Sequence, residues 1–130
     1  MFARGAPPHL IALLDWELAT VGDPLADLGY MTAMWAEPTD PADPMLDLCK
    51  VTRQPGFPAR HALAEAYADR TGRDLAELAW YQTLALWKAA IFLEGSYKRY
   101  RAGLARDPYL AGLEAGVPIL AQRALRQSAR

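Results

Sequence analysis

The sequence of 130 residues is long enough for one domain or part of one, and its 52% apolar and 22% charged residues are ordinary for a globular protein. Lysine and arginine together number 14 and aspartate and glutamate 15, so the formal charge of −1 indicates no basic surface for nucleic acid. Cys49 is the single cysteine, which excludes an intrachain disulfide and a zinc site built from several cysteines, and fits a reducing cytoplasm.

No segment of the sequence predicts a membrane protein or a secreted protein. Residues 1–10 lack the apolar core of a signal peptide. The most hydrophobic stretch, residues 78–93, is interrupted by Gln82 and Lys88, whereas a spanning helix needs about 20 predominantly apolar residues. We therefore expect a cytoplasmic protein that does not enter a membrane.

The first residues predict a short β-hairpin. Five apolar residues at 10–14 follow a turn sequence rich in glycine and proline, a pattern typical of a buried strand. Residues 1–3 then form the end of a preceding strand, and residues 4–9 form the turn. A two-stranded hairpin is marginal alone, so it needs another element to pack on.

The pattern changes from strand to helix at Asp23. This residue precedes Pro24, as an N-cap aspartate precedes a proline in the first helical turn. Four apolar residues then recur at spacings of three, three and four, which predicts one buried helix face: Leu25, Leu28, Met31 and Trp35. Residues 37–44 contain three prolines and are predicted to form a loop, and residues 45–51 a single helical turn.

Three further helical segments are predicted. One follows Pro58 and ends at Gly72 as its C-terminal cap. The second covers residues 75–101, with a break near Ala79, and the last covers residues 110–127 and contains a proline. Four aromatic residues of the second segment are expected in the core, with an aromatic ligand cage as the alternative: Trp80, Trp87, Phe92 and Tyr97. The predicted fold class is mainly α with the short N-terminal hairpin.

Two carboxylates at the end of the first apolar run carry the chemical signal of the sequence. Asp15 follows the predicted buried strand directly, and Glu17 stands two residues later. A carboxylate in this place can cap a turn, pair with a cation or bind a metal. Mg²⁺ prefers one or two carboxylates together with substrate phosphates, so the pair also suits this ion.

Asp15-Trp16-Glu17 resembles the Asp-Phe-Gly position of protein kinases in the Asp-x-Glu form of small-molecule kinases, and residues 22–29 resemble the stretch that follows it in aminoglycoside-phosphotransferase-like proteins. The subgroup most similar to this sequence is fused to, or encoded near, acyl-CoA dehydrogenases. Other parts of the chain resemble the same subgroup: residues 57–58, 67–73 and 87–100. The resemblance covers essentially the whole chain and is strongest over residues 14–29.

The resemblance implies the helical subdomain of a kinase-like C-terminal lobe, with residues 1–22 as the hairpin and metal-ligand loop and residues 23–130 as the helical subdomain. It implies Asp15 as the principal magnesium ligand and Glu17 as a second ligand or as a partner that contacts the ion through water. Asp27 takes the place of the helix aspartate that holds the catalytic loop, and Asp23 caps the helix that carries it. ATP or GTP is the implied phosphoryl donor, and a small molecule with a hydroxyl group is the implied acceptor.

The sequence departs from the family at the catalytic base. The family's His-Gly-Asp, followed by an asparagine, is expected upstream of Met1, and neither His9 nor His61 belongs to such a motif. We therefore expect a C-terminal fragment that binds neither magnesium nor nucleotide alone and has no activity alone. A complementing N-terminal half is one expected partner. The alternatives are a helical module for binding or homo-oligomerisation without catalysis, and a remnant without function.

Overall fold

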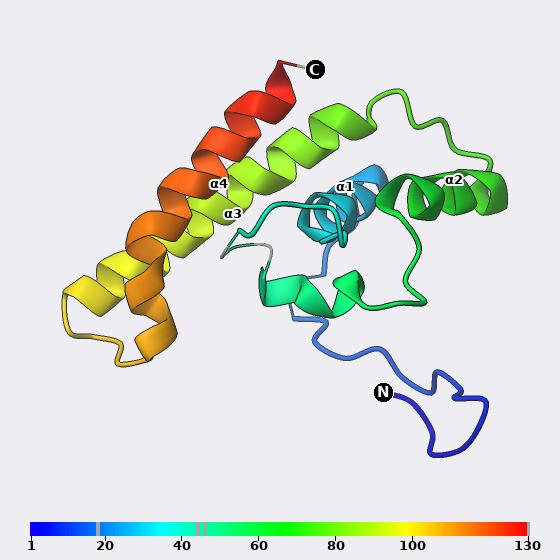
Figure 1. The fold of residues 1–130 in the computed structure, drawn as a ribbon, viewed down its shortest axis with the longest axis horizontal. Helices are drawn as coiled ribbons and strands as arrows, with labels where there is room; N and C mark the ends of the chain where they lie inside the picture. Colours follow the sequence, from blue (N-terminus) through cyan, green and yellow to red (C-terminus); the bar gives the residue numbers. More distant parts are fainter. Residues whose placement is uncertain (18, 44, 46, 130) are drawn as a thin grey trace.

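The fold was analysed in a computed structural model that describes residues 1–17, 19–43, 45 and 47–129. These residues form four α-helices and two 3₁₀ helices and contain no sheet, so the prediction of a mainly α fold is confirmed (Figure 1). In chain order the elements are α1 (Leu25–Met34), η1 (Asp47–Arg53), α2 (Arg60–Thr71), α3 (Leu78–Arg101), η2 (Pro108–Gly112) and α4 (Leu113–Ser128).

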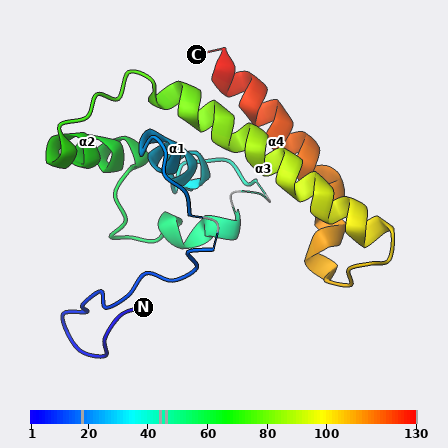
Figure 2. The same cartoon turned by 180° about the vertical axis from the view of Figure 1, so that it is seen from behind.

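Helix α3 is the longest element, and the other helices are arranged around it. Helices α3 and α4 lie side by side and antiparallel, as both ribbon views show (Figures 1 and 2). Helix α1 packs against α3, and α2 packs against α1. The arrangement therefore has α3 as a shared support for α1 and α4.

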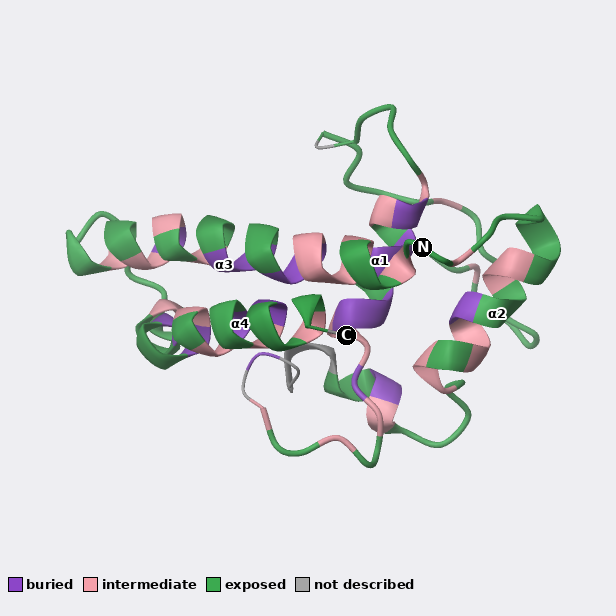
Figure 3. Ribbon diagram, turned by 90° about the horizontal axis from the view of Figure 1, so that it is seen from above, coloured by how far each residue is buried: buried purple, intermediate pink, exposed green. Residues whose placement is uncertain are grey.

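Two clusters of buried apolar side chains hold the helices together. The larger lies between α3 and α4, and Leu113 and Leu120 are almost completely buried in it. Met45, which precedes η1 in the chain, belongs to the same cluster. The smaller joins α1 to α2 through Leu28 and Ala64. Figure 3 shows that the buried positions of α3 and α4 lie on the faces that these helices turn to each other. Burial of these residues from water is the main source of the stability of the fold.

The contact between α1 and α3 requires a glycine. A Cβ atom added at Gly29 would lie 2.7 Å from the Cβ of Tyr81 and 2.8 Å from its carbonyl carbon. These distances are too short for any side chain, and one of the two atoms belongs to the backbone of α3. Gly29 therefore sets how closely the two helices approach.

Two of the helix ends predicted from sequence are confirmed. The Oδ1 atom of Asp23 accepts a hydrogen bond of 2.9 Å from the backbone N–H of Leu25, the first residue of α1. Gly72 ends α2 with a φ of 70°, and its N–H donates to the carbonyl of Ala68. This left-handed conformation favours glycine, which has no Cβ to clash. Both ends are thus determined by local chemistry.

The predicted buried strand at residues 10–14 is wrong. The N-terminal segment doubles back on itself, but it forms only a single antiparallel bridge, between Phe2 and Leu10. Four of its apolar side chains are between 56% and 65% exposed: Leu10, Ile11, Leu13 and Leu14. None of the described residues forms a sheet on which this hairpin can pack, and a hairpin without such support does not develop regular strands.

The prediction that four aromatic side chains of α3 belong to the core is correct only for Tyr97, which packs on the larger apolar cluster. Trp80, Trp87 and Phe92 are each more than half exposed. Trp80 and Trp87 line an open groove beside α4, which covers them only in part, so the helix has fewer neighbours than its apolar composition predicts. The other boundaries shift by a few residues, and Pro44 of the predicted loop lies outside the described residues.

We expect Gly29→Ala to destabilise the fold by about 1–3 kcal/mol, because the added methyl group must displace the backbone of α3. The free energy of unfolding, measured by circular dichroism in urea, provides the test. Gly95→Ala is the matched control, since a Cβ there meets no atom within 4 Å. That control should be neutral or slightly stabilising, as alanine favours helix over glycine. Equal effects of the two substitutions would show that the close approach is unimportant.

Candidate functional site

The segment that contains the two candidate metal ligands is an exposed turn. The indole N–H of Trp16 donates to the carbonyl of Leu13 at 2.8 Å, and the N–H of Ala19 donates to the carbonyl of Trp16 at 3.0 Å. Asp15 lies inside this turn with a φ of 70°, the only positive value among the described residues other than glycine. A non-glycine residue in this region is strained, and such strain is concentrated at functional sites.

Asp15 and Glu17 both present their carboxylates to solvent. Neither makes a hydrogen bond or an ion pair with any described residue, so both carboxylates are available to an external cation. Across the described part of the chain, no three side chains of histidine, cysteine, aspartate or glutamate lie close enough to enclose a metal ion. This segment thus offers at most two carboxylates, and Mg²⁺ bound by so few protein ligands depends on substrate phosphates and water for the rest of its coordination.

Asp23 connects this segment to the helices. Its Oδ1 atom accepts from the N–H of Leu25, and its Oδ2 atom accepts from the hydroxyl of Tyr81 on α3 at 3.0 Å. The bond from Leu25, then that from Tyr81 and the nearby charge of Arg73 lower the pKa of Asp23, against a smaller opposing effect of desolvation. The same contact raises the pKa of Tyr81. Asp23 therefore fixes the end of the candidate metal loop to both α1 and α3.

Asp27 lies in the first turn of α1, where a negative charge is favoured by the helix dipole. Its side chain is exposed and borders a cavity of about 130 Å³ that Tyr30 and Lys88 also line. No described residue forms a hydrogen bond or an ion pair with its carboxylate. The role of Asp27 in holding a catalytic loop stays a prediction, because the 130 residues contain no such loop.

The two histidines have no part in this arrangement. His9 lies in the N-terminal turn, where its backbone carbonyl accepts from Ala3, and His61 lies in the first turn of α2; both side chains are exposed. Neither joins a metal-binding group within the described ranges.

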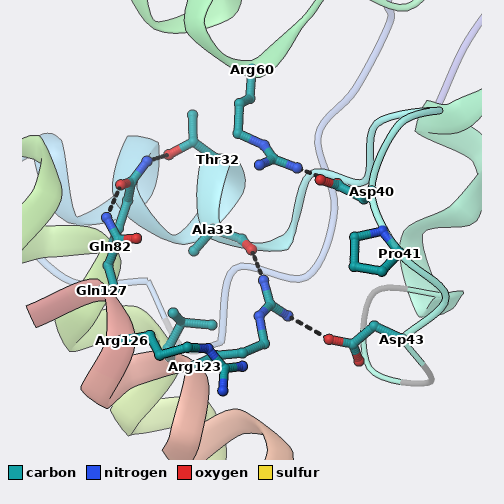
Figure 4. A pocket seen from close by; sticks show the side chains of 11 residues that line it. Thr32, Ala33, Asp40, Pro41, Asp43, Arg60, Gln82, Arg123, Arg126 and Gln127 are labelled. Carbon is teal, nitrogen blue, oxygen red and sulfur yellow. Dashed lines mark hydrogen bonds and ion pairs between the residues drawn. The ribbon is translucent and has the colours of Figure 1, made fainter. Parts of the chain in front are cut away.

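Sequence reasoning missed a second polar site, which is formed by residues far apart along the chain. Thr32, Asp40, Arg60, Gln82 and Arg123 border one cavity, although they come from four helices and a loop (Figure 4). Such a site leaves no local sequence signal, because helix packing alone brings its members together.

No α-helix that the structure describes is both long enough and apolar enough to cross a membrane. This includes α3, in which charged side chains occur from Lys88 to Arg101.

Comparison with known proteins gives one family and several relatives. The sequence model of the phosphotransferase enzyme family matches residues 1–81. Acyl-CoA dehydrogenase family member 11 of Mus musculus is 33% identical over 98 residues, 73% of this chain and 12% of the relative. The protein of that name from Gallus gallus is 30% identical over 94% of this chain and 16% of the relative. Acyl-CoA dehydrogenase family member 10 of Mus musculus is 30% identical over 75% of this chain.

The chain spans only a small share of these relatives, between 9% and 16% of their length. No solved structure gives a significant match.

We expect Tyr81→Phe to raise the pKa of Asp23 toward the ordinary value of 3.8 without reaching it, since the bond from Leu25 remains. A depressed carboxyl pKa contributes stability above the unfolded value, and this stability is lost as the pH falls through the folded value. The variant should therefore lose less stability than the native chain on acidification below about pH 4. NMR titration of the carboxyl resonance measures the pKa directly.

Tyr67→Phe is the control for this titration, because Tyr67 also packs near α1 but forms no bond with Asp23. An unchanged Asp23 pKa in Tyr81→Phe would show that the two side chains are not bonded in solution.

Proposed function

The chain belongs to the phosphotransferase enzyme family, and on this basis we propose that it forms part of an enzyme that transfers a phosphoryl group from ATP or GTP to a hydroxyl group of a small molecule. The observation that carries the proposal is the family match over residues 1–81, which includes the strained turn with its two unpaired carboxylates. A turn of this kind has no structural need for two acids close together. A metal-binding role explains both.

Asp15 is proposed as the principal magnesium ligand and Glu17 as the second ligand. Magnesium supplies charge neutralisation on the phosphate oxygens when it is bound. The backbone at Asp15 has a left-handed conformation, and eight residues later the bonds of Asp23 fix the chain to α1 and α3.

The catalytic base and the nucleotide-binding residues are proposed to lie outside these 130 residues. The sequence contains no His-Gly-Asp motif and no second metal-ligand cluster among the described residues. Phosphoryl transfer depends mainly on positioning and on charge stabilisation. A chain that holds only one side of the magnesium site is therefore proposed to be inactive alone and to require a complementing N-terminal half.

The proposal predicts that the DNA preceding Met1 encodes a His-Gly-Asp motif followed by an asparagine. In the polypeptide that joins that segment to this chain, Asp15→Asn should lower kcat for ATP-dependent phosphorylation by about a hundredfold or more. The variant would lose a ligand of the metal ion that neutralises the negative charge on the phosphate oxygens in the transition state. A coupled ADP-release assay with a panel of hydroxylated acceptors measures the rate.

Asp69→Asn provides the matched control, since Asp69 is an exposed aspartate on α2 that makes no described contact. Its kcat should equal that of the parent polypeptide. Calorimetric titration of Mg–ATP into the 130-residue chain alone should give no saturating heat. Absence of the motif in every upstream reading frame, or equal rates for both variants, contradicts the proposal.

A second candidate function is self-association without catalysis, and one surface supports it. The groove between α3 and α4 has a volume of about 420 Å³ and is lined almost entirely by apolar side chains, including Trp80, Trp87 and Leu125. Ile91 and Phe92 extend the exposed apolar surface along α3. Large apolar surfaces of this kind usually mark interfaces. The proposed occupant is the same groove of a second copy, related by a two-fold axis.

Self-association predicts that Leu125→Glu shifts a dimer to a monomer, because the new charge cannot be desolvated within an apolar contact. Leu104→Glu is the matched control, since Leu104 is 79% exposed against 72% for Leu125 and lies in the loop after α3, outside the groove. Light scattering coupled to size-exclusion chromatography measures the mass. A monomeric native chain eliminates this function.

A further inference from the structure

The polar site of Figure 4 is a cavity that lies apart from the turn around Asp15 and is lined mainly by polar and charged side chains. It has a volume of about 260 Å³ and lies between the C-terminal part of α1, the loop of residues 37–43 and the helices α2, α3 and α4 (Figure 4). Its lining includes three arginines, two aspartates and two glutamines, but none of residues 15–27. The site therefore does not rest on the function proposed above.

Two of the arginines, Arg60 and Arg123, are held in place by hydrogen bonds and ion pairs of their guanidinium groups. Arg60 of α2 is paired with Asp40, and its Nη2 atom also donates to the carbonyl of Trp35 at 2.9 Å. Arg123 of α4 donates through Nη2 to the carbonyl of Ala33 at 2.9 Å. These bonds link α2 and α4 to the end of α1 and to the loop. They also hold both guanidinium groups rigidly beside the cavity.

One nitrogen of each of these guanidinium groups has no hydrogen-bond acceptor. The Nε atom of Arg60 and the Nη1 atom of Arg123 are both buried without a hydrogen-bond partner among the described residues. Asp43 lies 3.6 Å from Nη1 of Arg123, close enough for ionic attraction but too far for a hydrogen bond. Arg126, one turn later on α4, forms no bond with a described residue. A buried donor left unsatisfied costs about 1–3 kcal/mol.

Another part of the cavity wall is formed by the side-chain amides of Gln82 and Gln127, which hydrogen bonds hold in fixed orientations. The hydroxyl of Thr32 donates to the carbonyl of Leu28 at 2.7 Å, so its oxygen accepts the 3.0 Å bond from Nε2 of Gln82. The Oε1 atom of Gln82 in turn accepts from Nε2 of Gln127 at 2.7 Å. Each amide nitrogen has a second hydrogen that this series does not use. The wall therefore offers further N–H donors in fixed orientations.

The residues that line the cavity carry an excess of one positive charge, because three guanidinium groups face two carboxylates. Glu37, outside the lining, has its carboxylate 3.9 Å from Nη2 of Arg60. Burial lowers the pKa of Arg123, and the carboxylate of Asp43 acts in the opposite direction. A further negative charge would complete the neutralisation of the buried guanidinium group.

We propose that this cavity binds an oxyanion, the carboxylate or phosphate group of a small molecule, through the exposed guanidinium group of Arg126, with the positive charges of Arg60 and Arg123 beside it. The planar guanidinium group matches these anions because it donates two parallel hydrogen bonds. The amides of Gln82 and Gln127 donate from their part of the wall. A water molecule occupies about 30 Å³ in the liquid, so the cavity accommodates such a group together with several waters.

The test titrates inorganic phosphate and, separately, acetate into the ¹⁵N-labelled chain at constant ionic strength, with sodium chloride alone as the blank. Saturable shifts of the side-chain amide signals of Gln82 and Gln127 are expected at millimolar concentrations. Tighter binding of phosphate identifies a phosphorylated ligand, and tighter binding of acetate identifies a carboxylate ligand. Shifts no larger than those of the chloride blank overturn the proposal.

Arg126→Gln should weaken the binding of the preferred anion by about tenfold, the effect of losing one charge-assisted hydrogen bond. Arg126 is exposed and has no described partner, so the variant should keep the native melting temperature. Arg70→Gln, at an equally exposed position in the last turn of α2, is the matched control and should bind as the native chain does. Equal affinities of the two variants contradict the assignment.

Discussion

The close contact between α1 and α3 is the constraint on which the rest of the structure depends. The absence of a side chain at Gly29 allows the backbones to approach, and the hydroxyl of Tyr81 then reaches the cap of α1 at Asp23. The next residue of α3, Gln82, reaches Thr32. Because an added Cβ would contact the backbone of α3, it would separate all of these groups together.

The same contact relates the fold to the candidate metal turn. The turn around Asp15 has no apolar support, since the neighbouring Leu13 and Leu14 are exposed. Its connection to the helices is the segment that ends at Asp23, which α1 and α3 hold jointly. The position of the proposed metal ligands therefore depends on a helix crossing that contains no metal ligand. Catalytic groups commonly lie on loops that a rigid scaffold positions in this way.

Polar and apolar contacts have different roles in this chain. The apolar clusters join α4 and α2 to the centre of the fold without much directional preference, whereas the bonds of Arg60 and Arg123 fix the loop of residues 37–43 to specific carbonyl groups. Because buried guanidinium groups are costly unless their donors are paired, such a network is either completed by another ligand or is a weak point of the structure. The groove beside α3, where Trp87 is more than half exposed, is by contrast an apolar surface that the described residues leave partly uncovered.

The sequence by itself determined the features that depend on neighbouring residues. The cap at Asp23, the end of α2 at Gly72, the proline-rich loop and the mainly helical class follow from local backbone chemistry and apolar spacing. Likewise, the resemblance to the family is strongest over residues 14–29, and this short segment also contains the candidate ligands Asp15 and Glu17. Only the tertiary structure decided which apolar residues are buried, that Gly29 must be a glycine, and that Arg60 and Arg123 border one cavity. These outcomes depend on which surfaces of distant helices meet, and no local pattern contains that information.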